Sequence, residues 1–206
     1  MSSARREVVR DQILGAAVKA LATHGYAGTT ARSIASIGGF APGVLYYYYA
    51  DLDQVLIATA EHTGRQREER YREALLGVTS AVALVERLEI LHREDGESGH
   101  IEAVQELVSA ARPGTALAAA VAEQTRKWES FAEQILRNVL RGSPLAKLVK
   151  VPVVARAAVA YYLGMQTLTH LDGDAERARA AFAQAAKLAA AFDKLPRFRR
   201  TARGEP

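Results

Sequence analysis

Apolar and polar positions alternate with a helical period along this chain. Apolar residues recur three or four positions apart, polar breaks separate the segments, and no part of the body shows the period of two that a strand needs. The first segment predicts a helix over about residues 6–24, ended by Gly25, because glycine suits the left-handed cap that closes many helices. The pattern predicts an all-α fold.

Two very short helices follow, joined by a glycine turn. Thr30 is placed to cap a two-turn helix that stops at Gly38–Gly39, and Pro42 suits the first position of the next helix because it has no N–H to leave unpaired. That helix carries Tyr46 to Tyr49, and four successive residues cover its whole circumference, so at least two rings must be exposed. This arrangement is typical of a helix-turn-helix.

A longer helical body follows the two short helices. Asp51 to Gln54 resembles a capping box that opens a helix reaching about Leu76, and five later polar breaks separate four or five further helices. We expect three parts: a three-helix, helix-turn-helix head, a larger helical body, and a basic tail. Their ranges are 1–50, 51–195 and 196–206.

The charge distribution sets the first 50 residues apart. No acidic residue occurs from Gln12 through Ala50, so a surface built from this stretch can approach a polyanion without carboxylate repulsion. The basic residues of the head are Arg5, Arg6, Arg10, Lys19 and Arg32. A second basic patch, more typical of a disordered tail than of a binding surface, comprises Arg197, Arg199, Arg200 and Arg203. The expected partner of the head is double-stranded DNA.

Composition excludes several other classes of protein. The chain of 206 residues has no cysteine, and its start lacks the apolar run of a secretory signal. Its longest apolar run, 157–171, is shorter than the roughly 18–20 residues of a membrane span. The five histidines have no metal-ligand spacing, and no phosphate loop or nucleophile elbow is present. We therefore predict a cytoplasmic protein without membrane partner, catalytic residues, metal or cofactor.

The head resembles the DNA-binding domain of the TetR family over about residues 8–60. The matching positions are Ile13-Leu14, Ala16-Ala17, Gly25-Tyr26, Thr29-Thr30, Ile34-Ala35, Gly43 to Tyr46, and Tyr49. The rest of the chain agrees in length and helical character. The resemblance implies contacts to phosphates and base edges from Thr30, Arg32, Pro42, Gly43, Val44, Tyr46, Tyr47 and Tyr48.

Four positions depart from the family pattern. Ala41 replaces the usual capping serine, Tyr48 replaces a common histidine, Ala50 replaces a basic or polar residue, and Leu52 replaces a frequent lysine. We expect one or two phosphate contacts per subunit to be missing, and hence a shallower dependence of DNA affinity on salt.

For the body, the resemblance implies a cavity for a small-molecule effector. The candidate residues are His62, Gln105, Trp128, Phe131, Ile135, Tyr162, Met165 and His170. Thr169 is a further possible polar anchor. An aromatic stripe at helical spacing is more often core than ligand site, so the core interpretation stays open.

The last two helices carry apolar stripes that predict a homodimer interface. The stripes comprise Val154, Ala158, Tyr161, Met165, Ala178, Phe182, Ala185, Ala189 and Phe192. The alternative is that both helices close a monomeric core.

Together these observations predict a homodimeric, TetR-like transcriptional regulator, and the resemblance to the family implies a repressor released by a small, largely apolar effector. One rival within regulation is an activator, or a protein whose ligand promotes DNA binding. Another rival is an all-helical ligand-binding or interaction protein that has lost operator recognition, as Ala41 and Leu52 suggest.

Overall fold

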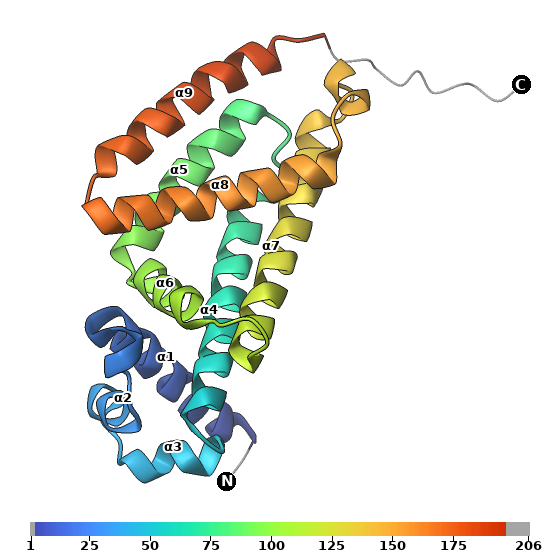
Figure 1. The fold of residues 1–206 in the computed structure, drawn as a ribbon. Coiled ribbons are helices and arrows are strands. Elements are labelled where there is room, and N and C mark those ends of the chain that lie inside the picture. Colours follow the sequence, from blue (N-terminus) through green and yellow to red (C-terminus); the bar gives the residue numbers. More distant parts are fainter. Residues whose placement is uncertain (1–2, 197–206) are drawn as a thin grey trace, which may run out of the picture. The chain divides into compact units, whose positions relative to one another are not determined.

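The structure, a computed structural model, describes residues 3–196, without the side chains of residues 3, 172 and 175. These residues form α-helices and one 3-10 turn, with no strand among them, which confirms the all-α prediction. The helices, labelled in Figure 1, are α1 (Ser3–Gly28), α2 (Ala31–Gly38), α3 (Pro42–Tyr48), α4 (Leu52–Leu75), α5 (Ala81–Glu97), α6 (His100–Ala110), α7 (Ala116–Leu140), α8 (Val151–Asp172) and α9 (Ala175–Asp193). The predicted basic tail lies, apart from Pro196, outside the described residues.

The chain divides into two compact units. The amino-terminal unit comprises Met1–Arg70 and Arg93–Arg126, and the carboxyl-terminal unit comprises Tyr71–His92 and Lys127–Pro206. The amino-terminal unit therefore holds helices α1 to α3 together with α6 and parts of α4, α5 and α7. The predicted functional boundary at residue 50 stays a prediction, since this compact unit extends beyond it.

The core of the head forms where α1, α2, α3 and the start of α4 meet. Its buried members are Ile13, Leu14, Ala16, Ala17, Ala20, Ile34, Leu45, Tyr49 and Val55. Leu45 is fully buried and Tyr49 is 9% exposed, so both face inward as their spacing predicts. Burying these apolar side chains, at about 25 cal/mol per Å² removed from water, holds helices that are too short to be stable alone.

Local capping defines the turn between α2 and α3. The Thr30 hydroxyl accepts a hydrogen bond from the Ser33 N–H, and the Ser33 hydroxyl accepts one from the Thr30 N–H, which forms a reciprocal capping box. Gly39 ends α2 at φ 70°, a left-handed conformation that glycine adopts without strain. Pro42 opens α3 behind Ala41, which provides no side-chain cap. The predicted turn chemistry and the missing cap are both confirmed.

Helix α6 packs against α1 in the amino-terminal unit. Ala103 and Leu107 of α6 share a buried cluster with Val18 and Leu21 of α1. The Glu106 carboxylate accepts a 2.7 Å hydrogen bond from the N–H of Tyr26, just after the helical path of α1 breaks at Gly25. This hydrogen bond satisfies a backbone donor at the point where the sequence predicts that the first helix ends.

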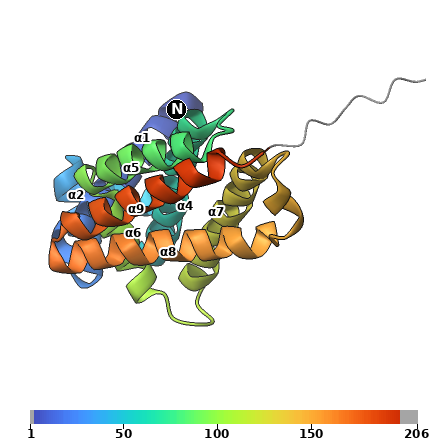
Figure 2. The ribbon, with the colours of Figure 1, turned by 90° about the horizontal axis from the view of Figure 1, so that it is seen from above.

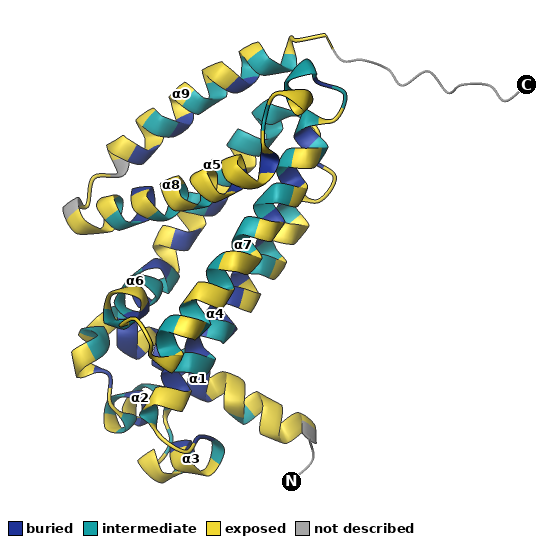
Figure 3. Cartoon of the chain, turned by 45° about the vertical axis from the view of Figure 1, so that its right-hand side comes forward, coloured by how far each residue is buried: buried dark blue, intermediate teal, exposed yellow. Residues whose placement is uncertain are grey.

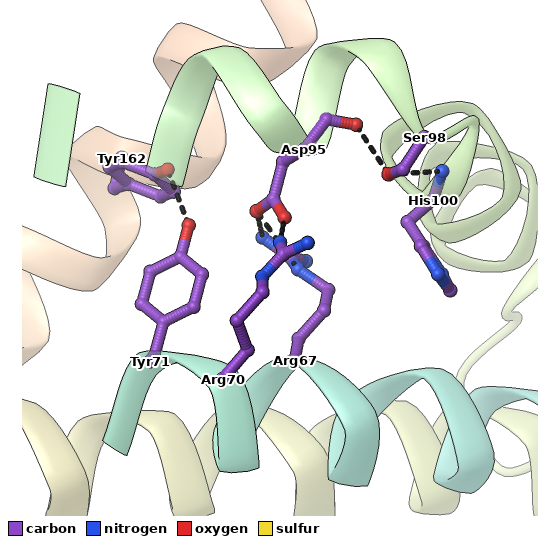
Figure 4. Close-up of polar contacts among 7 residues, drawn as sticks. All are labelled: Arg67, Arg70, Tyr71, Asp95, Ser98, His100 and Tyr162. Carbon is purple, nitrogen blue, oxygen red and sulfur yellow. Dashed lines mark hydrogen bonds and ion pairs between the residues drawn. The ribbon is translucent and has the colours of Figure 1, made fainter. Parts of the chain in front are cut away.

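A buried group of charges lies further along this unit. Arg67 and Arg70 of α4 both pair with the carboxylate of Asp95 from α5, as Figure 4 shows. The Arg67 Nη2 atom lies 2.7 Å from the Asp95 carboxylate, whose side chain is fully buried. Paired and hydrogen-bonded charges are the form in which burial of a carboxylate is tolerated.

Aromatic rings dominate the core of the carboxyl-terminal unit. The rings of Tyr71 and Trp128 meet edge to face with centroids 5.0 Å apart, and Trp128 meets Phe131 in the same way at 6.0 Å. The Tyr71 and Tyr162 hydroxyls are hydrogen-bonded at 2.6 Å (Figure 4). These interactions bring α4, α7 and α8 together within this unit.

Helices α8 and α9 form a hairpin in the same unit (Figure 2). Met165 of α8 and Ala178 and Phe182 of α9 form one buried cluster, and Ala189 is also buried. These four residues are thus buried within the described chain, and their predicted place in a subunit interface stays a prediction. Ala185 and Phe192 are half-buried.

The other residues of the predicted stripe on α8 remain exposed. Val154 is 39% exposed, Tyr161 64% and Leu168 48%, and Ala158 is also exposed. These four residues come from the first predicted stripe and share one side of α8. The described chain thus leaves an apolar helix face uncovered.

Candidate nucleic-acid interface

Helix α3 presents most of its surface to solvent. Tyr46 is 54% and Tyr47 67% exposed, Pro42 and Gly43 are exposed, and Val44 is half-buried. Figure 3 shows α3 as a largely exposed helix. The prediction that at least two tyrosines are exposed is confirmed, because only Leu45 and the following Tyr49 turn fully inward.

Two of the tyrosines border a basic hollow. Arg6 and Arg10 of α1 and Tyr47 and Tyr48 of α3 line a surface hollow of about 460 Å³. The Tyr47 and Tyr48 rings meet edge to face with centroids 5.1 Å apart. The hollow combines guanidinium and phenol donors on one surface, a chemistry that suits the oxygens of a phosphate group.

Tyr49 helps to position one of these arginines. The Arg10 guanidinium carbon lies 5.7 Å from the centroid of the Tyr49 ring, a distance at which a cation is attracted to the ring face. Burial raises the pKa of Tyr49 above its ordinary value of 10, although Arg10 acts in the opposite direction. The phenol therefore stays neutral at physiological pH, and its ring packs in the core while the arginine reaches the surface.

Thr30 and Arg32 lie exposed at the start of α2. The Thr30 oxygen is already used in the capping box, which fixes its orientation. At Gly43, an added Cβ atom would meet no other atom within 4 Å, so the fold itself does not require glycine there. A glycine that packing does not demand is consistent with close approach by a partner.

Leu52 has a structural role at the position where the family pattern has a lysine. It is half-buried and packs against both buried clusters of the amino-terminal unit. The substitution therefore adds apolar packing where a lysine would extend toward solvent. Arg6 and Arg10 were recognisable as basic residues, but only the fold shows that they share a hollow with Tyr47 and Tyr48.

The predicted effector residues fall into different parts of the chain. Trp128, Phe131, Ile135 and Tyr162 belong to one apolar cluster of the carboxyl-terminal unit, which Met165 extends through Tyr162. His62 and Gln105 belong to the amino-terminal unit. His170 is exposed on α8, and its predicted place in the effector site stays a prediction.

Two histidines of the amino-terminal unit have perturbed protonation. Burial lowers the pKa of His62 below its ordinary value of 6.5, against the opposing effect of Asp11, whose carboxylate lies 3.8 Å from its Nδ1 atom. Burial and the nearby charges of Arg67 and Arg70 lower the pKa of His100. In both imidazoles the shift favours the neutral form.

The sequence of the head matches a known family. Residues 13–59 match the family described as bacterial regulatory proteins, tetR family. The match covers the helix-turn-helix and the first turns of α4, and it supports a DNA-binding regulator. No protein with a curated description matches the chain.

Several solved structures share the fold. A transcriptional regulator of Rhodococcus sp., assigned to the TetR family, is 23% identical, with a TM-score of 0.74 over 87% of this chain and 97% of the other. The fatty acid degradation regulator FadR from Bacillus halodurans is 19% identical, with a TM-score of 0.72 over 92% and 97%. FadR from Bacillus subtilis, in complex with stearoyl-CoA, is 19% identical, with a TM-score of 0.70 over 87% and 96%.

A helix that crosses a bilayer needs about 20 predominantly apolar residues. Between residues 3 and 196, no helix combines the length and apolar character that such a span requires.

Proposed function

The amino-terminal domain of this chain belongs to the tetR family of bacterial regulatory proteins, and from that premise we propose that the protein is a homodimeric transcriptional repressor. The observation that carries the proposal is the exposed helix α3 beside the hollow of Arg6, Arg10, Tyr47 and Tyr48. Helix α3 enters the major groove of the operator, and Gly43 allows its first turn to approach the bases.

Phosphates on either side of the groove fix the orientation of the head. Arg6 and Arg10 neutralise one phosphate position at the hollow, where the Tyr47 and Tyr48 hydroxyls donate hydrogen bonds. Thr30 and Arg32 contact the backbone from the start of α2, with Pro42 and Val44 beside the recognition surface. Tyr46, the other strongly exposed ring, reaches a base edge or a sugar.

The second subunit supplies the second reading head. The exposed apolar face of α8, formed by Val154, Ala158, Tyr161 and Leu168, is the contact surface of the dimer. Two-fold pairing places two recognition helices on half-sites about 34–36 Å apart, one turn of duplex. This repetition compensates for the small number of base contacts that one seven-residue helix can make.

The effector is a small, largely apolar molecule bound in the helical body. Its support is the aromatic cluster of Trp128, Phe131 and Tyr162, and the similarity to a FadR whose structure contains stearoyl-CoA. Binding favours a conformation in which the two heads no longer match the half-sites, which releases the operator. A ligand that instead promotes DNA binding is the alternative within the same class.

Salt-dependent gel retardation tests the DNA interface, using the fragment upstream of the protein's own gene. Arg10→Ala and Tyr47→Ala are expected to weaken retardation, and Arg10→Ala to lower the slope of log affinity against log salt by about 0.9 for each phosphate that is no longer neutralised. The matched control is Arg179→Ala, exposed on α9. Unchanged retardation in both head variants with intact folding would reject the interface and favour the alternative of lost operator recognition.

Light scattering tests the subunit interface. Tyr161→Glu and Leu168→Glu are expected to convert a dimer into monomers, because a carboxylate on this face would be buried without a partner. Leu76→Glu, at an exposed apolar position outside α8, is the control and should remain dimeric. A wild-type protein with the mass of one chain at micromolar concentration would contradict the dimer.

A further inference from the structure

Gln166 occupies an unusual place in the carboxyl-terminal unit. It lies well inside α8 and is only 1% exposed, although glutamine is mostly found at protein surfaces. Its Nε2 atom is buried and has no hydrogen-bond partner. A buried amide donor without a partner opposes folding, so its presence needs a reason other than stability of the free protein.

A second buried donor lies on the same face of the helix. Thr169 follows Gln166 by three residues, and its hydroxyl is also buried without a partner. Residues three or four positions apart are neighbours on a helix surface, so the two groups belong to one stripe with Tyr162 and Met165. By contrast, the Thr167 hydroxyl donates to the Leu163 carbonyl within the helix and needs nothing else.

The rest of this stripe is apolar and uncharged. Met165 is buried with Ala178 and Phe182, and Tyr162 packs against that cluster. His92, the titratable group next to these rings, meets Tyr162 at 5.6 Å and Phe182 at 5.5 Å between centroids. Val85, Leu88 and Ala181 also pack against the cluster, so its described neighbours here are apolar. An ionised ligand group would be desolvated there without a full counter-charge, which favours a neutral ligand.

We propose that Gln166 and Thr169 are the polar anchor of the effector site and that they hold the carbonyl oxygen of an uncharged, otherwise apolar molecule. A carbonyl oxygen has two lone pairs and accepts one hydrogen bond from the amide and one from the hydroxyl. The inference deepens the proposed function, because it assigns the chemistry of the ligand that the repressor would respond to. Gln166 was not among the residues that the sequence singled out.

Replacing the amide by an apolar group of similar length separates a binding role from a structural one. Gln166→Met removes the buried amide N–H that has no hydrogen-bond partner. The melting temperature of the ligand-free protein is therefore expected to rise by about 2–4 °C. The control, Gln134→Met at an exposed position of α7, should change it little. A fall in the melting temperature of Gln166→Met would overturn the proposal, since it would show that the amide stabilises the free protein, for example through a buried water.

Binding of two probes tests the ligand chemistry. The methyl ketone 2-octanone and the hydrocarbon n-octane share an apolar chain, and only the ketone carries a carbonyl. In the NMR spectrum of isotope-labelled protein, the side-chain amide signal of Gln166 is identified by its absence in Gln166→Met. Titration with 2-octanone should shift this signal until the shift saturates. The variant should bind 2-octanone about tenfold more weakly and n-octane equally well. No saturable shift, or equal losses for both probes, would overturn the proposal.

Gel retardation of the same samples distinguishes this inference from the proposed function. If the wild-type protein retards the operator fragment but the Gln166 signal does not respond to 2-octanone, the anchor is wrong and DNA binding stands. If the signal responds but 2-octanone fails to release the fragment, the anchor is supported and effector control of DNA binding is contradicted. Release by 2-octanone in the wild type, abolished in Gln166→Met, supports both.

Discussion

A buried polar group of the amino-terminal unit contrasts with one of the carboxyl-terminal unit. The amino-terminal unit buries charges and pairs them, as Arg67 and Arg70 do with Asp95. The carboxyl-terminal unit buries neutral groups and leaves two of them, Gln166 and Thr169, without partners. A buried charge is tolerated only when it is matched within the fold, whereas an unmatched amide or hydroxyl has a cost that a ligand can later offset.

The units also differ in how their surfaces relate to their cores. In the amino-terminal unit, Arg10 contacts the ring of the buried Tyr49 while its neighbours Tyr47 and Tyr48 line the hollow. In the carboxyl-terminal unit, Met165 of α8 is buried, while Tyr161 and Leu168 of the same helix are exposed. The first surface is basic and polar, and the second is apolar.

The largest effect is expected from unbalancing the buried charges. Asp95→Ala leaves two guanidiniums without their shared carboxylate and should destabilise the protein by about 3–5 kcal/mol in urea unfolding. Glu123→Ala removes a carboxylate from an exposed pair with Arg126 and should cost about 0–1 kcal/mol. Equal losses in the free energy of unfolding for the two substitutions would show that the Asp95 carboxylate is not needed to compensate the two buried guanidiniums.

Acidification tests the same unit through its neutral histidines. The pKa values of His62 and His100 lie below 6.5 in the folded protein, so the unfolded chain binds more protons just below that pH. Stability should be constant above this value and decrease as the pH falls below it, by at most about 1.4 kcal/mol per pH unit for each histidine. Melting temperatures between pH 7.5 and 5.5 measure the effect.

Substitution of either histidine should reduce this pH dependence. His62→Gln and His100→Gln are each expected to give a flatter profile, while His24→Gln, at an exposed position, should keep the wild-type profile. Stability that rises on acidification would contradict the direction of both pKa shifts.

A smaller loss is expected for a neutral hydrogen bond in the carboxyl-terminal unit. Tyr71→Phe removes the hydroxyl that pairs with Tyr162 and should cost about 0.5–1.5 kcal/mol. Tyr46→Phe, at a ring that is 54% exposed on α3, should change stability by less than about 0.5 kcal/mol. Urea unfolding measures both. A loss for Tyr71→Phe as large as that for Asp95→Ala would remove the contrast between the units.

The smallest effect is a gain at the helix-turn-helix. Ala41 is extended and precedes α3 without a side-chain cap, so Ala41→Ser should add a hydrogen bond to the first turn. The expected stabilisation is about 0.5–1 kcal/mol in thermal or urea unfolding. Ala183→Ser, in the exposed middle of α9, is the control and should be slightly destabilising. A decrease in stability of Ala41→Ser would show that the start of α3 is fixed by packing alone.

Much of the amino-terminal domain was predictable because its signals are local. Thr30, Gly39 and Pro42 act within a few residues of their own position, so their types alone indicate a cap, a turn and a helix start. The inward orientation of Leu45 and Tyr49 also follows from helical spacing. The same local reasoning identified the exposed tyrosines but not the arginines that join them, because Arg6 and Arg10 belong to a different helix.

The amino-acid sequence alone specifies the all-helical class, the turn between α2 and α3, and the tyrosine-bearing surface. These features depend on backbone preferences and on hydrophobic periodicity within a few helical turns. Which residues of an apolar stripe are core depends on the assembled fold: Met165 and Phe182 pack within their own unit, while Tyr161 and Leu168 stay exposed. The pairing of Asp95 and the isolation of the Gln166 amide depend on it as well. Periodicity shows that a helix has an apolar face, but burial and pairing depend on residues that only folding brings near.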